Sequence, residues 1–273
     1  MSGDPRDDPD FWRVLAALGE TAGLLWQKGW AERNAGNLSC DVTDLVPERR
    51  GAAGATSTLF GAAFGELAGR RLLVTGAGSR MRDLAREPDV GCGVLQVAGD
   101  GAGCVVVWSG APEGRFVPTS ELPSHLAIHA ALRRRGSPHR AVVHTHPTEL
   151  LALSHDPRLS DGTRLNRALW AMHPEAVVSV PQGVGVVPYI LPGTTAQGSA
   201  AGAAMEAHDV ALWVKHGAVA AGTDFADAFD QLDTMNKAAG MLLLCRAAGY
   251  EPEGLSDPEL EELRRTYVRA AGS

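Results

Sequence analysis

Three histidines in this chain have the spacing of a metal site. His144 and His146 end a segment whose apolar residues, Val142 and Val143, predict a β-strand. Side chains alternate between the two faces of a strand, so residues two apart project from the same face. His216 follows a second apolar segment and precedes a glycine. Strand ends at one rim of a sheet commonly carry chemistry, and three imidazoles there would supply the nitrogen ligands of a catalytic zinc.

A His-x-His pair also has an ordinary interpretation. Either ring could be a surface or core histidine whose nitrogens are satisfied by hydrogen bonds. The third histidine at a strand end favours the metal site over this interpretation. We expect the other six histidines to be solvated or to support the residues of the site. They are His125, His129, His139, His155, His173 and His208.

Two turns of small residues could bind an anion. They contain Asn34, Gly36 and Asn37 in one turn and Thr75, Gly76 and Ser79 in the other. Exposed backbone N–H groups, amides and hydroxyls in such turns can hold a phosphate without a formal positive charge. Glycine turns after strands are also common without a ligand, so the residues alone leave phosphate binding open. The second turn lacks the full G-x-G-x-x-G pattern, and we expect no dinucleotide site.

Two glutamates are candidates for proton transfer. Glu121 follows Thr119 and Ser120 at the predicted start of a helix. The helix dipole favours a carboxylate there whatever its function, so the sequence supports a stabilising role and a catalytic role of Glu121 equally. Glu175 precedes an apolar segment that we predict to be a strand, and it could equally be a solvated residue at the start of that strand.

The composition bounds the class of protein. A chain of 273 residues with 45% hydrophobic and 21% charged residues is typical of a globular protein and fits one large α/β domain or two small ones. The net charge of −7 argues against general binding to nucleic acids or anionic membranes. No segment has the uninterrupted apolar length of a membrane span. Four dispersed cysteines without a Cys-x-x-Cys pair, and a polar start without a signal pattern, predict a cytoplasmic protein with reduced thiols.

The periodicity of apolar residues predicts an α/β fold. We predict helices over residues 9–31, 120–135, 148–153, 164–172, 195–207, 224–248 and 257–268. We predict strands over residues 38–42, 71–75, 94–97, 104–108, 142–146, 176–180, 185–190 and 210–215. Thr119 or Ser120 is the expected N-cap of the second helix, and residues 44–69 are expected to form a surface insertion with one helical turn. Strands outnumber the helices between them, which indicates a central mixed, largely antiparallel β-sheet flanked by helices on both faces.

Several motifs together resemble the class II aldolase/adducin family. They are Glu32–Leu38, Val74–Gly78, Val117–Pro123, His144–His146, Gly183–Gly185 with Pro192–Thr194, and His216–Gly217. They occur in the order that the family has and cover about residues 9–250. Ala77 departs from the pattern, since a phosphate-contacting hydroxyl is expected there, and Ser79 is a possible substitute. His173 and Pro174 before Glu175 are also unusual.

The resemblance implies a single α/β domain over residues 1–273. It implies an enzyme that cleaves a ketose 1-phosphate into dihydroxyacetone phosphate and an aldehyde. It implies one zinc ion on His144, His146 and His216, with Glu121 as the acid/base. It implies a phosphate grip by the two small-residue turns together with Thr119 and Ser120. It also implies a homotetramer with sites between subunits, in which Glu175 reaches the site of a neighbour.

One further observation and two alternatives bear on this expectation. Only three lysines occur, Lys28, Lys215 and Lys237, which disfavours a Schiff-base mechanism. Other enzymes on the same scaffold remain alternatives, namely another ketose-phosphate aldolase, a pentulose-phosphate 4-epimerase or a dehydratase. A non-catalytic, adducin-like interaction module is a further alternative, although it would have no need for three metal ligands and Glu121.

Overall fold

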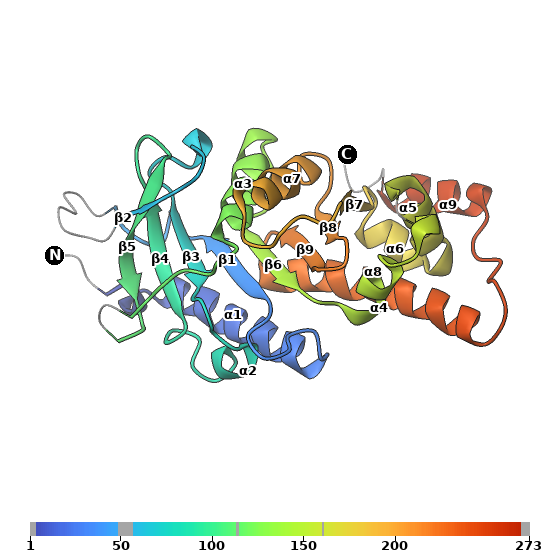
Figure 1. Cartoon of the computed structure of the whole chain (residues 1–273), viewed down its shortest axis with the longest axis horizontal. Helices are drawn as coiled ribbons and strands as arrows, with labels where there is room; N and C mark the ends of the chain where they lie inside the picture. Colours follow the sequence, from blue (N-terminus) through green and yellow to red (C-terminus); the bar gives the residue numbers. More distant parts are fainter. Residues whose placement is uncertain (1–3, 49–56, 113–114, 160, 269–273) are drawn as a thin grey trace.

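The computed structural model describes residues 4–48, 57–112, 115–159 and 161–268 and is built around one nine-stranded sheet (Figure 1). The strands are β1 (Asn37–Asp41), β2 (Ser57–Leu59), β3 (Arg71–Thr75), β4 (Cys92–Val97), β5 (Gly103–Ser109), β6 (Ala141–Thr145), β7 (Val184–Val187), β8 (Val210–Trp213) and β9 (Gly217–Gly222). Their order across the sheet is β2-β5-β4-β3-β1-β6-β9-β8-β7. Only the β7–β8 pair is parallel among these described strands, so the sheet is mixed and largely antiparallel, as predicted.

Helices cover both faces of the sheet. They are α1 (Pro9–Gln27), α2 (Met81–Leu84), α3 (Leu122–Arg134), α4 (Thr148–Leu153), α5 (Gly162–Met172), α6 (Pro174–Ser179), α7 (Thr195–Ala204), α8 (Phe225–Ala247) and α9 (Asp257–Leu263). Short 3-10 turns lie at Pro5–Asp7, Gly65–Leu67 and Pro157–Leu159, and a π-helical turn spans Arg264–Val268. None of the helices described is long and apolar enough to cross a lipid bilayer.

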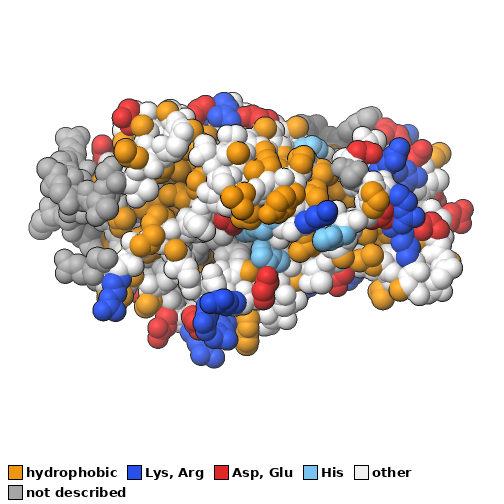
Figure 2. All heavy atoms as spheres, viewed as in Figure 1, with side chains coloured by type: hydrophobic (Ala, Val, Ile, Leu, Met, Phe, Trp, Pro, Cys, Tyr) orange, Lys and Arg blue, Asp and Glu red, His pale blue; other side chains and the backbone are white. Residues whose placement is uncertain are grey.

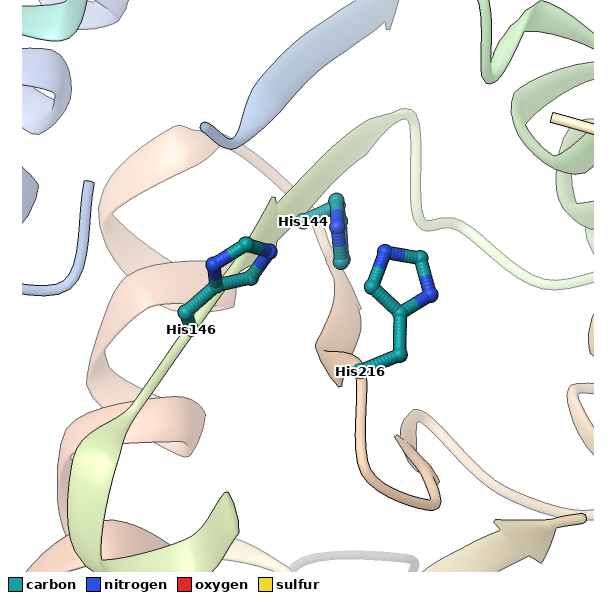
Figure 3. Close-up of side chains that lie close together, drawn as sticks. All are labelled: His144, His146 and His216. Atoms are coloured by element: carbon teal, nitrogen blue, oxygen red, sulfur yellow. The ribbon is translucent and has the colours of Figure 1, made fainter. Parts of the chain in front are cut away.

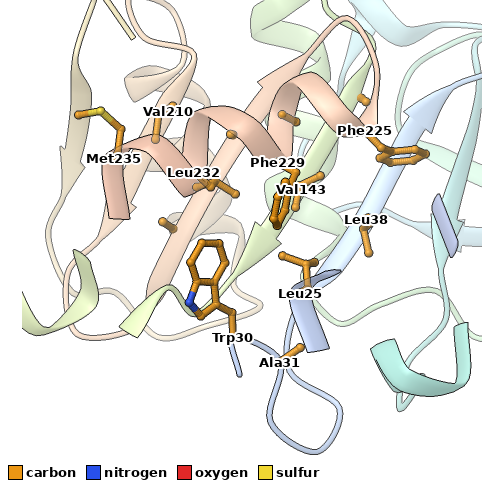
Figure 4. Packing of buried hydrophobic residues seen from close by; sticks show 14 of the residues in the cluster. Leu25, Trp30, Ala31, Leu38, Val143, Val210, Phe225, Phe229, Leu232 and Met235 are labelled. Atoms are coloured by element: carbon orange, nitrogen blue, oxygen red, sulfur yellow. The ribbon is translucent and has the colours of Figure 1, made fainter. Parts of the chain in front are cut away.

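The alternation along β6 shows how the two faces are packed. Val143 belongs to the large core beneath α1 and α8, in which Leu25 and Phe229 also lie (Figure 4). Val142, one residue earlier, packs on the opposite face with Ile128 of α3. Successive residues of β6 therefore face opposite helix layers, as the period of a strand requires. His144 lies two residues after Val142, so its side chain projects from the same face of the strand, toward α3 and α7.

The strand β9 was missed in the sequence, although it is an interior strand of the sheet. It pairs with both β6 and β8, and all six of its residues are buried. Its sequence, Gly-Ala-Val-Ala-Ala-Gly, has few of the β-branched and aromatic residues that mark a strand. Small residues are needed here: a Cβ at Gly217 would lie 2.6 Å from the Thr145 carbonyl oxygen. Tertiary crowding therefore decided a strand that propensity did not indicate.

Three further local predictions were wrong. Residues 176–180 belong mostly to helix α6, which begins with Pro174 and whose N-cap is His173, with its Nδ1 accepting from the Glu175 N–H. Helix α3 begins at Leu122, and neither Thr119 nor Ser120 is its N-cap: that position is Glu121, without a side-chain cap. Within residues 44–69, the described part contains a 3-10 turn but also the edge strand β2, which was not predicted. In helix α6, the proline at the first helical position and the histidine at the N-cap outweighed the strand-like sequence Ala-Val-Val.

Candidate metal centre and active site

Three imidazoles converge at one edge of the central strands. His144 ends β6 and His146 follows it, while His216 lies in the short turn between β8 and β9. Figure 3 shows the three rings turned toward one another. One ligand nitrogen from each lies within 4.8 Å of the others, so the three can hold a metal ion. The turn that carries His216 needs Lys215 in the left-handed region at φ 62°, and β8 ends at Trp213, earlier than predicted.

The outer nitrogens of two rings are held by other groups. His144 Nδ1 lies 2.9 Å from the carbonyl oxygen of Ala218, which can only accept, so Nδ1 carries the proton. His146 Nδ1 lies 2.8 Å from a carboxylate oxygen of Glu32. Both contacts leave Nε2 without a proton in the neutral ring and directed inward. Metal-binding histidines are usually oriented in this way by a carbonyl or carboxylate behind them.

Glu121 lies beside the three histidines and contacts two of them. Its Oε2 lies 3.1 Å from His144 Nε2, and its Oε1 lies 3.1 Å from His216 Nε2. Burial raises the pKa of Glu121, but the attraction of His144 when that ring is protonated, together with hydrogen bonds from His216 and Asn37, outweighs burial and holds the pKa well below the usual glutamate range. Glu121 is therefore ionised at neutral pH although it is only 6% exposed.

The facing pair of Glu121 and His144 favours a cation. Burial lowers the pKa of His144 to about 4, so this ring is uncharged at neutral pH. Its bare Nε2 then faces a carboxylate oxygen at 3.1 Å, and both atoms are acceptors. Two acceptors at this distance repel unless a proton or a metal ion lies near both. The donor set thus fits a divalent metal that accepts imidazole ligands.

His216 has a different second contact. The Gln197 Oε1 accepts a hydrogen bond from the Gly193 N–H at 2.9 Å, so the amide nitrogen of Gln197 faces His216 Nδ1 at 3.1 Å. In this arrangement His216 Nδ1 accepts, and its Nε2 donates to Glu121. Binding a metal through Nε2 requires the other tautomer, with the Gln197 amide turned so that its oxygen accepts from Nδ1.

The predicted phosphate-binding residues mostly line the same cavity. A cavity of about 210 Å³ is bounded by the three histidines and Glu121, by Asn34, Ala35, Gly36 and Asn37, by Gly76, Ala77 and Gly78, and by Thr119, Ser120 and Pro192. Gly36 is required at its position because φ is +81° and a Cβ would lie 3.0 Å from the His144 carbonyl oxygen. The structure thus brings six predicted phosphate contacts beside the candidate metal ligands. These are Asn34, Gly36, Asn37, Gly76, Thr119 and Ser120.

Two of the predicted phosphate contacts lie elsewhere. Thr75 is buried, and its hydroxyl oxygen accepts from the Leu38 N–H at 3.1 Å. The Ser79 hydroxyl donates to the Gly91 carbonyl at 3.1 Å and lines a neighbouring cavity instead. Ser79 therefore does not replace the hydroxyl that Ala77 lacks. The Asn37 side chain lines the site, but both ends of its amide are already engaged within the protein.

Glu175 is exposed in the first turn of α6 and does not line this cavity. Its predicted action in the site of a neighbouring subunit stays a prediction. Several contacts in the site were not foreseen: Glu32 behind His146, Gln197 behind His216, and Trp213, whose indole stacks on His144 with ring centroids 4.4 Å apart. Glu32 lies within the motif Glu32–Leu38, whereas no local pattern in the sequence distinguished Gln197 or Trp213.

On the face shown in Figure 2, histidine side chains reach the surface near the middle of the molecule, next to a group of hydrophobic side chains. Exposed apolar residues of the chain include Val117, Tyr189 and Leu191, with 62%, 59% and 64% of their surface accessible. All three lie within three residues of a residue that lines the cavity.

Comparison with known proteins agrees with this geometry. The family model described as Class II Aldolase and Adducin N-terminal domain matches residues 16–243. A rhamnulose-1-phosphate aldolase of Bacteroides thetaiotaomicron is 38% identical over 257 residues, which cover 93% of this chain and 94% of that protein. A rhamnulose-1-phosphate aldolase of Pectobacterium carotovorum is 35% identical over 268 residues, covering 94% and 93%.

Solved structures show the same architecture. A sugar-phosphate aldolase from Thermotoga maritima superposes with a TM-score of 0.74 at 32% identity, covering 90% of this chain and all of that one (100%). An L-fuculose 1-phosphate aldolase superposes with a TM-score of 0.63 at 20% identity, covering 94% and 96%, which supports the fold alone. The resemblance found in the motifs is confirmed by the match over most of the chain, and the chain belongs to the class II aldolase and adducin family.

Proposed function

We propose that this protein is a metal-dependent aldolase that cleaves rhamnulose 1-phosphate into dihydroxyacetone phosphate and lactaldehyde. The observation that carries the proposal is the convergence of three histidines and an ionised, buried glutamate in one cavity with the small-residue turns. The relatives named rhamnulose-1-phosphate aldolase, which match nearly the full chain, support this sugar over others.

Neutral groups would hold the phosphate. No lysine or arginine is among the described residues that line the cavity. Backbone N–H groups around Gly36 and Gly76, the Asn34 amide and the hydroxyls of Thr119 and Ser120 would instead donate to the phosphate oxygens. Asn34 and Ser120 are exposed and can adjust to a ligand. Ala77 offers no hydroxyl, so phosphate affinity rests on the remaining donors.

The metal would be zinc, held by His144, His146 and His216. Imidazole nitrogens in a three-histidine set are typical ligands of catalytic zinc. When bound, zinc supplies a Lewis acid that stabilises negative charge on the substrate oxygens during cleavage. Neutral histidines leave the full charge of the ion available for this purpose.

Glu121 would carry the proton. Cleavage between C3 and C4 of the ketose removes the proton of the C4 hydroxyl and leaves a carbanion at C3 that must be protonated. An ionised carboxylate beside the metal ligands can collect the hydroxyl proton and return it to C3, and the reverse steps serve in the synthetic direction. The scarcity of lysine, with none among the residues that line the cavity, supports this route over a Schiff base.

We propose a homotetramer with active sites between subunits. Glu175 is exposed and absent from the cavity of its own chain, so a catalytic role for it needs a second copy. The exposed apolar side chains of Val117, Tyr189 and Leu191 would be covered in such an assembly. We also propose a cytoplasmic location, supported by the free thiols of Cys40, Cys92, Cys104 and Cys245.

An aldol-cleavage assay tests the proposed function. Purified protein with one equivalent of zinc would be given rhamnulose 1-phosphate, fuculose 1-phosphate and ribulose 1-phosphate in parallel, with dihydroxyacetone phosphate detected by reduction with a coupling dehydrogenase. We expect turnover to be greatest with rhamnulose 1-phosphate. Greater turnover of another ketose phosphate would reject the assigned sugar, and absence of turnover with all three, despite bound zinc, would reject the aldolase assignment.

A further inference from the structure

A buried chain of polar side chains leads away from the site into the protein. Asn37 and Ser39 of β1 face His125 and His129 of α3, and all four are at most 7% exposed. Asn37 Nδ2 lies 2.8 Å from Glu121 Oε2, and Asn37 Oδ1 contacts His125 Nε2. Ser39 Oγ then lies 2.6 Å from His125 Nδ1 and 2.8 Å from His129 Nε2.

The orientation of the Asn37 amide sets the direction of every hydrogen bond in this chain. Its NH₂ group donates to Glu121 Oε2, and its oxygen faces His125 Nε2. His125 must then carry its proton on Nε2. In a neutral ring Nδ1 accepts, so the Ser39 hydroxyl donates to it. The Ser39 oxygen is left to accept from His129 Nε2–H. Each donor thus points toward Glu121.

This arrangement is suited to holding groups in place. An amide does not pass protons along as an imidazole or a hydroxyl does, so Asn37 interrupts any proton path between Glu121 and His125. Burial lowers the pKa of His125 to about 3 and of His129 to about 4, so both rings stay neutral and keep one tautomer at neutral pH. A fully satisfied buried network of this kind is rigid and holds its members in one geometry.

We propose that His125, backed by Ser39 and His129, is a positioning residue that fixes the Asn37 amide and through it the carboxylate of Glu121. The inference rests on the proposed role of Glu121 as the acid/base. It also gives Asn37 a second task besides lining the phosphate cavity. Without the His125 donor, the Asn37 amide can turn over, and its oxygen would then face the carboxylate and repel it.

Two substitutions at His125 separate positioning from packing. His125→Leu removes both contacts, whereas His125→Gln keeps a side-chain N–H that can reach Asn37 Oδ1. With rhamnulose 1-phosphate as substrate, we expect His125→Leu to lower kcat on the order of 10- to 100-fold with KM within about twofold. His125→Gln should recover most of this loss. Zinc content should equal that of the unmodified protein in both, because none of the three histidines is altered.

A matched control comes from the next residue of α3. Leu126 is buried in a separate apolar cluster, so Leu126→Ala loosens the same helix without touching the polar chain. If His125→Leu lowers kcat no more than Leu126→Ala does at equal folded fraction, the positioning role is rejected. Equal loss in His125→Leu and His125→Gln would reject it as well, because the retained donor would then have no effect.

A measurement on the unmodified protein covers the case in which His125→Leu does not fold. Nitrogen-15 NMR of the imidazoles at pH 7.5 should show His125 and His129 neutral with the proton on Nε2. The Nδ1–H tautomer in His125 would overturn the inferred direction. The proposed function fails separately: if Glu121→Gln turns over normally with zinc bound, the acid/base assignment is wrong, whereas a dead Glu121→Gln with an unaffected His125→Leu rejects only the positioning role.

Discussion

Replacing Glu121 with glutamine tests the catalytic proposal directly, because it removes the titratable proton and keeps the shape. In the structure the carboxylate is 6% exposed and is surrounded by His144, His216 and Asn37. A glutamine oxygen in the place of Oε2 can still accept from Asn37, and the NH₂ in the place of Oε1 then faces His216 Nε2, which can accept when that ring carries its proton on Nδ1. The substitution therefore keeps the size of the side chain and its hydrogen bond to Asn37 while removing the charge.

The expected effects on stability and on turnover differ by orders of magnitude. Loss of the charge at the N-cap of α3 costs about 0.3–1 kcal/mol. We therefore expect the melting temperature to change by no more than roughly 4 °C. Loss of an acid/base group should lower kcat on the order of 10²–10⁴-fold.

The assay is steady-state cleavage of rhamnulose 1-phosphate, with zinc measured by elemental analysis on the same sample. Glu259→Gln is the matched control, since Glu259 also lies at the N-terminal end of a helix, and glutamine can keep its hydrogen bond to the Ser256 N–H. It should leave kcat unchanged. Turnover of Glu121→Gln near that of the control, with zinc present, would show that Glu121 is only a stabilising residue of the α3 N-terminus.

Four further outcomes are expected. His216→Ala should lose most of the bound zinc by elemental analysis while exposed His155→Ala keeps it, and full retention in His216→Ala would reject the three-histidine site. Borohydride with substrate should not inactivate the protein and a chelator should, so covalent trapping on a lysine would contradict the mechanism. Gly36→Ala should lower the free energy of unfolding by about 1–3 kcal/mol, more than Gly29→Ala does, because Gly29 also has a positive φ but has open space for a Cβ. Equal urea midpoints of the two variants would contradict this. The free energy of unfolding of the metal-free protein should decrease as pH falls from about 6.5 to about 4. In the folded protein the pKa values of His125 and His129 are about 3 and about 4, so both rings stay neutral over this range, whereas they bind protons in the unfolded chain. The slope should approach about 1.4 kcal/mol per pH unit for each of these histidines, and a flat urea-denaturation profile over this range would contradict it.

Local rules determined the parts of the protein that depend on one segment. Alternation along a strand placed His144 and His146 on one face, and the structure has them there. The periodicity of apolar residues predicted β3 and α4 at their observed bounds. The composition, the net charge and the lengths of the apolar segments indicated a globular protein. The order of motifs was enough to recognise the family.

Contacts between distant segments decided the remainder. Helix α6 and strand β9 contradicted their local patterns because a proline with a capping histidine, and a need for small residues beside Thr145, outweighed propensity. Glu121 was ambiguous in the sequence because every first-turn carboxylate gains from the helix dipole. Its neighbours come from β1, β6 and the β8–β9 turn, so only the fold could show that it faces two imidazoles. The partners of Asn37 and Gln197 lie up to 88 residues away, and no spacing along the chain encodes a contact of that kind.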